Sequence, residues 1–353
     1  MKNIYLQIAD DALKIQMVLA TVTRAEGSTP QKPGSSAIFS ERGLLSGTIG
    51  GGVVEGRVQS ASQEALKSGR STHLTYDLFN DISNKEEAIC GGKITVLLDA
   101  KPSNSISAFR QLKESIEQRI PGVLITMVTE SDSSPLLINR FWMSSEVILD
   151  IPKEFLEKIS PVTEELIKKG KHSDFREMKL SLPGAETESL FFLEPVFPAE
   201  KLIIAGAGHI GRSLAHIGNL LGFEVTVIDD RPEYASIENI PDADHIIVND
   251  IGTAMKELKK GNDTYVVIVT RGHKDDAEAL KPCIGASLAY TGMIGSKRKV
   301  ATMKQEFIDK GFATKAEWDK IYAPVGLDIG SQTVEEIAVS IAAQLVQVRN
   351  SKK

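Results

Sequence analysis

Apolar residues follow two kinds of spacing along the first 197 residues of the chain. Where they recur every three to four positions they predict amphipathic helices, and where they form short runs they predict strands. The predicted helices span residues 3–14, 53–66, 103–119 and 153–169. The predicted strands span residues 17–27, 36–40, 44–50, 72–78, 90–100, 122–130, 135–139, 145–150, 176–180 and 190–194. Helices and strands mixed without regular alternation are typical of an α+β domain.

The pattern changes after residues 194–201, EPVFPAEK, where two prolines precede an apolar strand. From there the chain repeats strand, helix and strand, which predicts a parallel sheet with helices on both faces. We therefore expect an N-terminal α+β domain over residues 1–197 and a C-terminal Rossmann-like, doubly wound α/β domain over residues 198–353. Near the C-terminus, Thr333 and Glu336 have the spacing of a capping box before a helix with an apolar stripe.

The first strand of the second domain runs into the motif G-x-G-x-x-G, and the second strand ends at Asp229. The first glycine permits a tight turn, the second lets the backbone approach a phosphate, and the third lets the helix lie close to the strand. The predicted cofactor contacts of this turn are Gly206, Gly208, His209, Ile210 and Gly211. Asp229 is expected near a hydroxyl-bearing group of the ligand, and Arg231 near a second phosphate or in solvent. The alternative is a Rossmann scaffold with an empty site.

Loops after the later strands carry further candidates. Arg271 and His273 should face the same crevice as His209, because loops at the carboxyl ends of parallel strands line the ligand site. A second set lies at the start of the next helix, where Gly and Ser precede three consecutive cations and favour an anion. Its candidates are Gly295, Ser296 and Arg298. The alternatives are supporting hydrogen bonds for the histidines and a solvated helix face for the cations.

Two glycine clusters stand out in the N-terminal domain. Six glycines within residues 43–56 predict a close backbone approach to a ligand or to another segment. The candidates in the two clusters are Gly50, Gly51, Gly52, Gly91 and Gly92. Glu55 begins the helix after the first cluster, where its carboxylate caps the helix or takes part in chemistry. Cys90 is a candidate thiolate for a soft metal or for sulfur transfer, with inert packing as the alternative.

Composition narrows the classes of partner. A net charge of −6 and dispersed Lys and Arg residues offer no broad basic face, so we expect no nucleic-acid partner. No apolar run approaches the roughly 20 residues that span a bilayer, and Asp10 and Asp11 interrupt the place of a signal peptide. The only two cysteines, Cys90 and Cys283, lack the paired spacing of a zinc or iron–sulfur site. We expect a cytoplasmic protein with no membrane partner.

Several long segments together make the chain resemble the XdhC/CoxI family. They are EGSTPQKPGSSAIFS, GTIGGGVVEG and CGGKITVLLDA, then IIAGAGHIGRSLA, VTVIDDR, TRGHKDD, AYTGMIGSKRK and APVGLDIGSQTVEEIAVSIAAQL. The resemblance implies an accessory protein for xanthine dehydrogenase and related molybdenum hydroxylases. Such a protein binds molybdenum cofactor (molybdopterin) and assists its sulfuration and insertion into the enzyme.

The resemblance also implies partners and site residues. The partners are a xanthine dehydrogenase-type molybdenum enzyme and, as an optional further partner, a cysteine desulfurase. Apart from the resemblance, we expect a homodimer. Cys90 becomes a candidate molybdenum or sulfur contact. Many members have a second histidine where this chain has Arg271, so an anion contact is favoured there over a two-histidine metal site.

Two other functions stay open at this point. An NAD(P)-dependent oxidoreductase would use the glycine motif and Asp229 for NAD(P), with His273 as its acid–base group. A nucleotide-sensing regulator would bind the ligand without chemistry. In the accessory-protein interpretation, no turnover is expected beyond sulfur handling.

Overall fold

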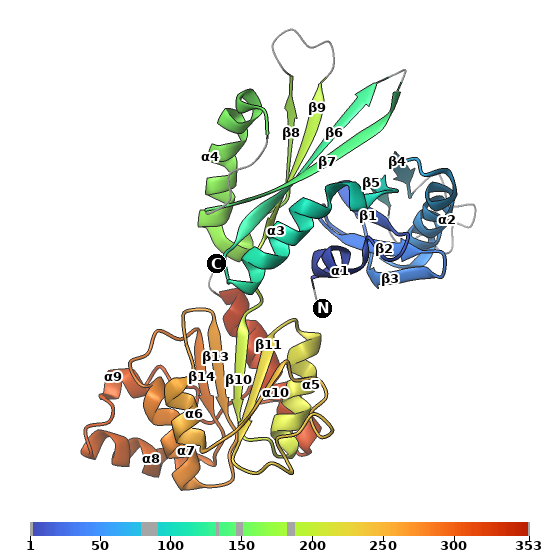
Figure 1. The fold of residues 1–353 in the computed structure, drawn as a ribbon. Helices are drawn as coiled ribbons and strands as arrows, with labels where there is room; N and C mark the ends of the chain where they lie inside the picture. The colour runs from blue at the N-terminus through green and yellow to red at the C-terminus, as the bar shows by residue number, and fades with distance from the viewer. Residues whose placement is uncertain (1–2, 79–90, 132–133, 146–150, 182–187, 352–353) are drawn as a thin grey trace. The chain divides into compact units, whose positions relative to one another are not determined.

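The computed structural model describes residues 3–78, 91–131, 134–145, 151–181 and 188–351. The chain divides into two compact units between Pro198 and Ala199. Each unit is described by itself, with the element labels of Figure 1.

The N-terminal unit begins with a five-stranded antiparallel sheet in the order β3-β2-β1-β5-β4. The strands are β1 (Val18–Gly27), β2 (Ser36–Ser40), β3 (Gly43–Gly47), β4 (Thr72–Asp77) and β5 (Gly92–Asp99). Helix α2 (Gly52–Ser68) buries Val54 and Val58 against one face, where Val18 and Val22 of β1 point. The opposite face packs on α1 (Ile4–Asp11) and α3 (Ile106–Glu117), the latter preceded by the short helix η1 (Pro102–Ser105).

A second, four-stranded antiparallel sheet completes this unit in the order β7-β6-β9-β8. Its strands are β6 (Gly122–Ser131), β7 (Ser134–Ser144), β8 (Arg176–Leu180) and β9 (Ser189–Val196). Helix α4 (Lys153–Lys169), followed by η2 (Gly170–His172), covers one face through Phe155 and Ile159. The strand predicted at 135–139 continues to Ser144, because Phe141, Trp142 and Met143 extend the apolar run. The strand predicted at 145–150 lies almost wholly outside the described residues.

The C-terminal unit is built on a five-stranded parallel sheet in the order β12-β11-β10-β13-β14. Its strands are β10 (Lys201–Ala205), β11 (Glu224–Asp229), β12 (His245–Val248), β13 (Thr264–Ile268) and β14 (Tyr290–Met293). Its helices are α5 (His209–Leu220), α6 (Ile251–Glu257), α7 (His273–Leu280), η3 (Lys281–Cys283), α8 (Lys297–Asp309), α9 (Lys315–Trp318) and α10 (Val334–Ser351). This order and the helices on both faces confirm the predicted Rossmann-like fold.

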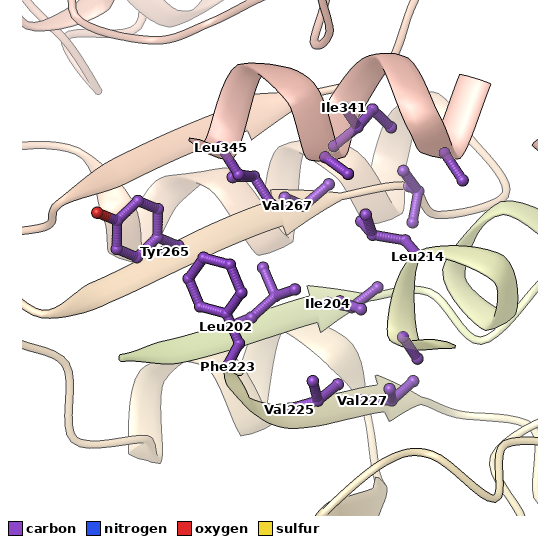
Figure 2. Packing of buried hydrophobic residues seen from close by; sticks show 14 of the residues in the cluster. Leu202, Ile204, Leu214, Phe223, Val225, Val227, Tyr265, Val267, Ile341 and Leu345 are labelled. Carbon is purple, nitrogen blue, oxygen red and sulfur yellow. The ribbon is translucent and has the colours of Figure 1, made fainter. Parts of the chain in front are cut away.

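Alternate residues of each parallel strand pack on opposite layers of helices. Leu202 and Ile204 of β10 lie in the cluster that includes Leu214 of α5 with Ile341 and Leu345 of α10, as Figure 2 shows. The intervening β10 residues pack on the layer of α6, α7 and α8. Strands buried on both faces are therefore apolar along their whole length, which is why they are recognisable in the sequence.

The start of α10 has the predicted capping box. The Glu336 N–H donates to Thr333 Oγ1 at 3.2 Å, and the Thr333 N–H donates to Glu336 Oε2 at 3.0 Å. These bonds satisfy backbone groups that the first helical turn leaves without partners. The capping box thereby stabilises the N-terminus of α10, whose apolar stripe packs on the sheet.

A polar cluster lies between the two sheets of the N-terminal unit. The Tyr5 hydroxyl donates to Glu194 Oε2 at 2.6 Å, and Arg140 forms a buried ion pair with Asp99. Burial raises the pKa of Glu194 to about 7, although the Tyr5 hydrogen bond and the charge of Arg140 act to lower it. The folded unit therefore binds a proton at this carboxyl more tightly than the unfolded chain does.

We predict that stability of the N-terminal unit falls as the pH rises from 4.5 to 7, because folding disfavours ionised Glu194. The free energy of unfolding should drop by about 2 kcal/mol over this window. Urea unfolding followed by Trp142 fluorescence in a Trp318→Phe background, which has no other tryptophan, measures it. Glu194→Gln should abolish the dependence, and an unchanged dependence in that variant would exclude this carboxyl as its source.

Candidate functional site

The glycine turn between β10 and α5 gives its three glycines different surroundings. A Cβ atom on Gly206, whose φ is +116°, would lie 2.5 Å from the Val269 carbonyl oxygen. A Cβ on Gly211 would lie 1.9 Å from the Gly206 carbonyl oxygen. A Cβ on Gly208 would meet nothing within 4 Å. The outer two glycines thus allow close packing, and the middle one leaves the backbone open to an approaching group.

This turn lies at the point where the strand order reverses. β10 pairs with β11 on one side and with β13 on the other, and the Val269 N–H donates to the Ala205 carbonyl at 2.8 Å. The loop after β13 therefore runs beside the glycine turn and continues into Arg271 and Gly272. Ligands of open α/β sheets bind in the crevice at such a reversal.

The start of α5 can receive an anion. Gly208 occupies the N-cap position, and no side chain caps it within the described part of the chain. His209 is exposed and Ile210 is half-buried. Free N–H groups in the first turn, together with the helix dipole, attract a phosphate or another anion.

The loop after β13 brings two predicted residues to the same edge of the sheet. Arg271 is exposed, and a Cβ on Gly272 would meet nothing within 4 Å. His273 begins α7, and its Nε2 lies 3.4 Å from Glu306 Oε2 of α8. A histidine 40% exposed with a carboxylate neighbour can move a proton or support an anion contact.

A buried carboxylate that the sequence analysis missed holds this loop in place. Asp276 is fully buried and accepts hydrogen bonds from the Thr270 hydroxyl and from Lys299 Nζ. In the sequence, only its spacing marks Asp276. It lies three residues before Ala279 and four before Leu280, and all three residues share the buried face of α7. Asp276 thus ties the β13 loop to α8.

At the start of α8, the candidates do not share one environment. Ser296 caps the helix, since its Oγ accepts from the Lys299 N–H at 3.2 Å. Arg298 is exposed and Gly295 is half-buried. Because the Lys299 ammonium is bound to Asp276, Arg298 is the better placed of the two to meet an anion.

Asp229 has a different environment from the expected one. Its Oδ1 accepts from the Arg231 N–H and Nε at 3.1 and 2.8 Å, and its Oδ2 accepts from the Ala207 N–H and Arg231 Nη2 at 2.7 and 2.9 Å. Burial alone would raise the pKa of Asp229, but the hydrogen bonds from Arg231 and Ala207 lower it to about 2. A ligand hydroxyl at this carboxylate would require Arg231 to move.

In the N-terminal unit, the first glycine cluster forms the loop before α2. All three glycines have positive φ; a Cβ on Gly50 would lie 2.7 Å from the Pro30 ring, whereas a Cβ on Gly51 or Gly52 would meet no atom of the described residues within 4 Å. Glu55 Oε2 accepts from the Thr48 hydroxyl at 2.9 Å and from the Ile49 and Gly51 N–H groups at 3.1 and 3.4 Å. The carboxylate of Glu55 therefore holds the loop before α2, and these bonds do not reach the N–H groups of the first helical turn that the predicted helix cap would satisfy.

The second glycine cluster packs against the loop that follows β1. The Ser28 N–H donates to the Gly91 carbonyl at 3.0 Å, and a Cβ on Gly92 would lie 2.3 Å from the Glu26 carbonyl oxygen. The loop that starts there also contains Pro30, which contacts Gly50. Three segments distant in sequence thus meet at one place, while Cys90 lies outside the described residues.

The described residues offer neither a metal site built from clustered ligands nor a membrane-spanning helix. No group of three or more His, Cys, Asp or Glu side chains could hold a metal ion there. None of the described helices is long and apolar enough to cross a membrane. Cys283 is buried, and burial raises the pKa of its thiol to about 12, so it is no candidate for thiolate chemistry.

Alanine substitutions should lower the stability of the C-terminal unit at a glycine in close backbone contact, but not at a glycine that faces open space. Gly211→Ala should destabilise the C-terminal unit by about 3 kcal/mol, because its Cβ overlaps the Gly206 carbonyl. Gly208→Ala should change stability by less than about 1 kcal/mol, because its Cβ enters open space. Urea unfolding followed by Trp318 fluorescence in a Trp142→Phe background measures both, and equal losses would refute the distinction.

Removing the partner of Asp276 should be costly. Lys299→Met leaves a buried carboxylate without its cation and should destabilise the C-terminal unit by about 3 kcal/mol. Adding Asp276→Asn should recover most of the loss, and Lys297→Met on the exposed side should have little effect. The same fluorescence assay applies, and a neutral Lys299→Met would show that the ion pair does not hold the loop.

Comparison with known proteins identifies relatives along both units. A family model described as the XdhC Rossmann domain matches residues 202–345, and one described as the XdhC and CoxI family matches residues 12–77. A protein of Bacillus subtilis (strain 168), named as a probable subunit of xanthine dehydrogenase, is 26% identical over 336 residues, which cover 95% of this chain and 93% of the relative. The uncharacterized protein YqeB of Escherichia coli (strain K12) is 34% identical over 152 residues, 43% of this chain and 28% of that protein.

A solved structure has the same fold. The crystal structure of a xanthine dehydrogenase from Bacillus halodurans matches with a TM-score of 0.76 at 26% identity, covering 99% of this chain and 96% of that one. The two matched family models together exceed half of the chain. The chain therefore belongs to the XdhC/CoxI family and carries an XdhC Rossmann domain in its C-terminal unit.

Proposed function

We propose that this protein is an accessory factor that binds molybdenum cofactor and assists its sulfuration and insertion into a xanthine dehydrogenase-type molybdenum hydroxylase. Family membership and relatives named as xanthine dehydrogenase proteins support the association with such enzymes. A second copy of the chain, and a cysteine desulfurase as the source of sulfur, are the further partners in this proposal.

The observation that carries the proposal is the open backbone at Gly208. It lies at the uncapped start of α5 beside the loop that bears Arg271 and His273, where a phosphate finds N–H donors and cations together. Molybdopterin is a pterin with a terminal phosphate, so its phosphate suits this position. Arg298, at the start of α8, is a further candidate anion contact.

In the N-terminal unit, the residues proposed to meet molybdenum or sulfur lie in the two glycine clusters. Gly51 and Gly52 have open space around them, so a ligand can approach their backbone closely. Cys90 follows in this proposal as the contact for molybdenum or sulfur. Its test is Cys90→Ser, which should lose delivery or bound metal; full retention of both would remove Cys90 from the site.

The alternative function, an NAD(P)-dependent oxidoreductase, needs an acceptor for a ribose hydroxyl at the end of β11. The Asp229 carboxylate already has four donors, two on each oxygen. With its acceptor positions occupied, Asp229 is unsuited to bind the ribose of a nicotinamide dinucleotide. A ligand held mainly by its phosphate needs no such acceptor.

Cofactor retention tests the proposal. Freshly released molybdenum cofactor is added anaerobically to the full chain, the mixture is desalted, and molybdenum and oxidised-pterin fluorescence are measured in the protein fraction. Wild-type protein should retain both, and Gly208→Ala should retain roughly tenfold less, because its Cβ blocks the backbone.

Gly261→Ala is the matched control for this experiment. It makes the same chemical change in the same unit, on the loop before β13 at the opposite edge of the sheet, where the new Cβ meets only the tip of Asp263 at 3.3 Å. Its retention should equal that of the wild type. Tight binding of NAD with no retained pterin or molybdenum would contradict the proposal.

A further inference from the structure

The Asp229 carboxylate has no acceptor position left. A carboxylate offers about four hydrogen-bonding positions on its two oxygens. Here the Ala207 N–H takes one, and Arg231 takes three through its backbone N–H, Nε and Nη2. The residue is 1% exposed, so the acid at the end of β11 is closed to ligands in this structure.

Arg231 is itself held firmly in this position. Its guanidinium lies over the Tyr234 ring, 4.0 Å from the centroid, and its side chain is only 21% exposed. The bidentate pairing with Asp229 neutralises its charge, and the ring covers one face of the guanidinium. A second phosphate of a ligand would have to break this ion pair before Arg231 could bind it.

We propose that Arg231 is a specificity-determining residue that makes the Rossmann crevice reject nucleotides whose ribose diol needs Asp229. The crevice then selects a phosphate monoester without an adjacent ribose over a dinucleotide. Applied to molybdenum cofactor, the inference rests on the proposed function. It predicts that the protein prefers the monophosphate form of the cofactor to its dinucleotide form.

The physical argument compares two ligands at one site. Both place a phosphate on the N–H groups at the start of α5. A ribose beside that phosphate would bring two hydroxyls to the end of β11, where they would lose water without finding the carboxylate they need. A ligand whose phosphate is followed by no ribose avoids this cost.

The test uses nucleotides alone, so that it is independent of the molybdenum cofactor. Binding of NAD and of ADP-ribose to the full chain is measured by calorimetry for the wild type, Arg231→Ala and the double variant Arg231→Ala/Asp229→Asn. Arg231→Ala frees the carboxylate and should bind both nucleotides roughly tenfold more tightly than the wild type. The double variant should lose this gain, because an amide cannot accept two hydroxyls as a carboxylate does.

Arg212→Ala is the matched control, since Arg212 lies on the exposed surface of α5 and makes no contact with Asp229 in the described structure. Its nucleotide affinity should equal that of the wild type. Wild-type binding as tight as that of Arg231→Ala would overturn the proposal, as would a folded Arg231→Ala with no gain. NADP binding that is strong in the wild type and lost in Arg231→Ala would also overturn it, because Arg231 would then be a phosphate contact.

The two proposals can fail separately. If the wild type retains no pterin or molybdenum but Arg231→Ala gains nucleotide affinity, the proposed function fails and the role of Arg231 stands. If the wild type retains the cofactor and also binds NAD tightly, the role of Arg231 fails and the proposed function stands.

Discussion

The close approach of α5 to the end of β10 is the constraint on which the C-terminal unit depends. Gly211 comes so near the Gly206 carbonyl that no side chain fits between them, and this contact fixes where the helix begins. Because the helix begins there, Gly208 is its N-cap residue and faces open space among the described residues. The same turn carries the Ala207 N–H to Asp229, which links the glycine motif to the second strand. The helix packing, the open anion position and one of the four donors to Asp229 therefore follow from one backbone geometry.

A similar logic operates in the N-terminal unit, with different residues. The loop after β1 meets both glycine clusters, through Pro30 against Gly50 and through Ser28 against Gly92. These contacts require some of the glycines for packing, whereas a Cβ on Gly51 or Gly52 would meet no atom of the described residues within 4 Å. In both units, therefore, glycines serve two purposes: some are required by close backbone contacts, and others leave room for a ligand.

The sequence predicted the features that are enforced by backbone sterics. The parallel sheet, the turn at Gly206, the capping box at Thr333 and the strands of the first sheet are visible because each demands particular residue types at fixed spacing. Side-chain pairing was not predictable in this way. Nothing in the sequence says that Arg231 folds back on Asp229, or that Lys299 reaches Asp276, since both depend on rotamers and on loops brought together by the fold. The continuation of β7 to Ser144 was missed because the predicted strand ended at residue 139, before the apolar residues 141–143.

The central claim is that the cargo's phosphate lies at the start of α5, and hydrogen–deuterium exchange with and without bound molybdenum cofactor tests it most directly. Under anaerobic conditions, cofactor binding should slow exchange in peptides covering residues 208–211, because the N–H groups at the start of α5 become hydrogen-bonded to the phosphate. Bound cofactor with unchanged exchange across this turn, and protection confined to other parts of the chain, would contradict the account.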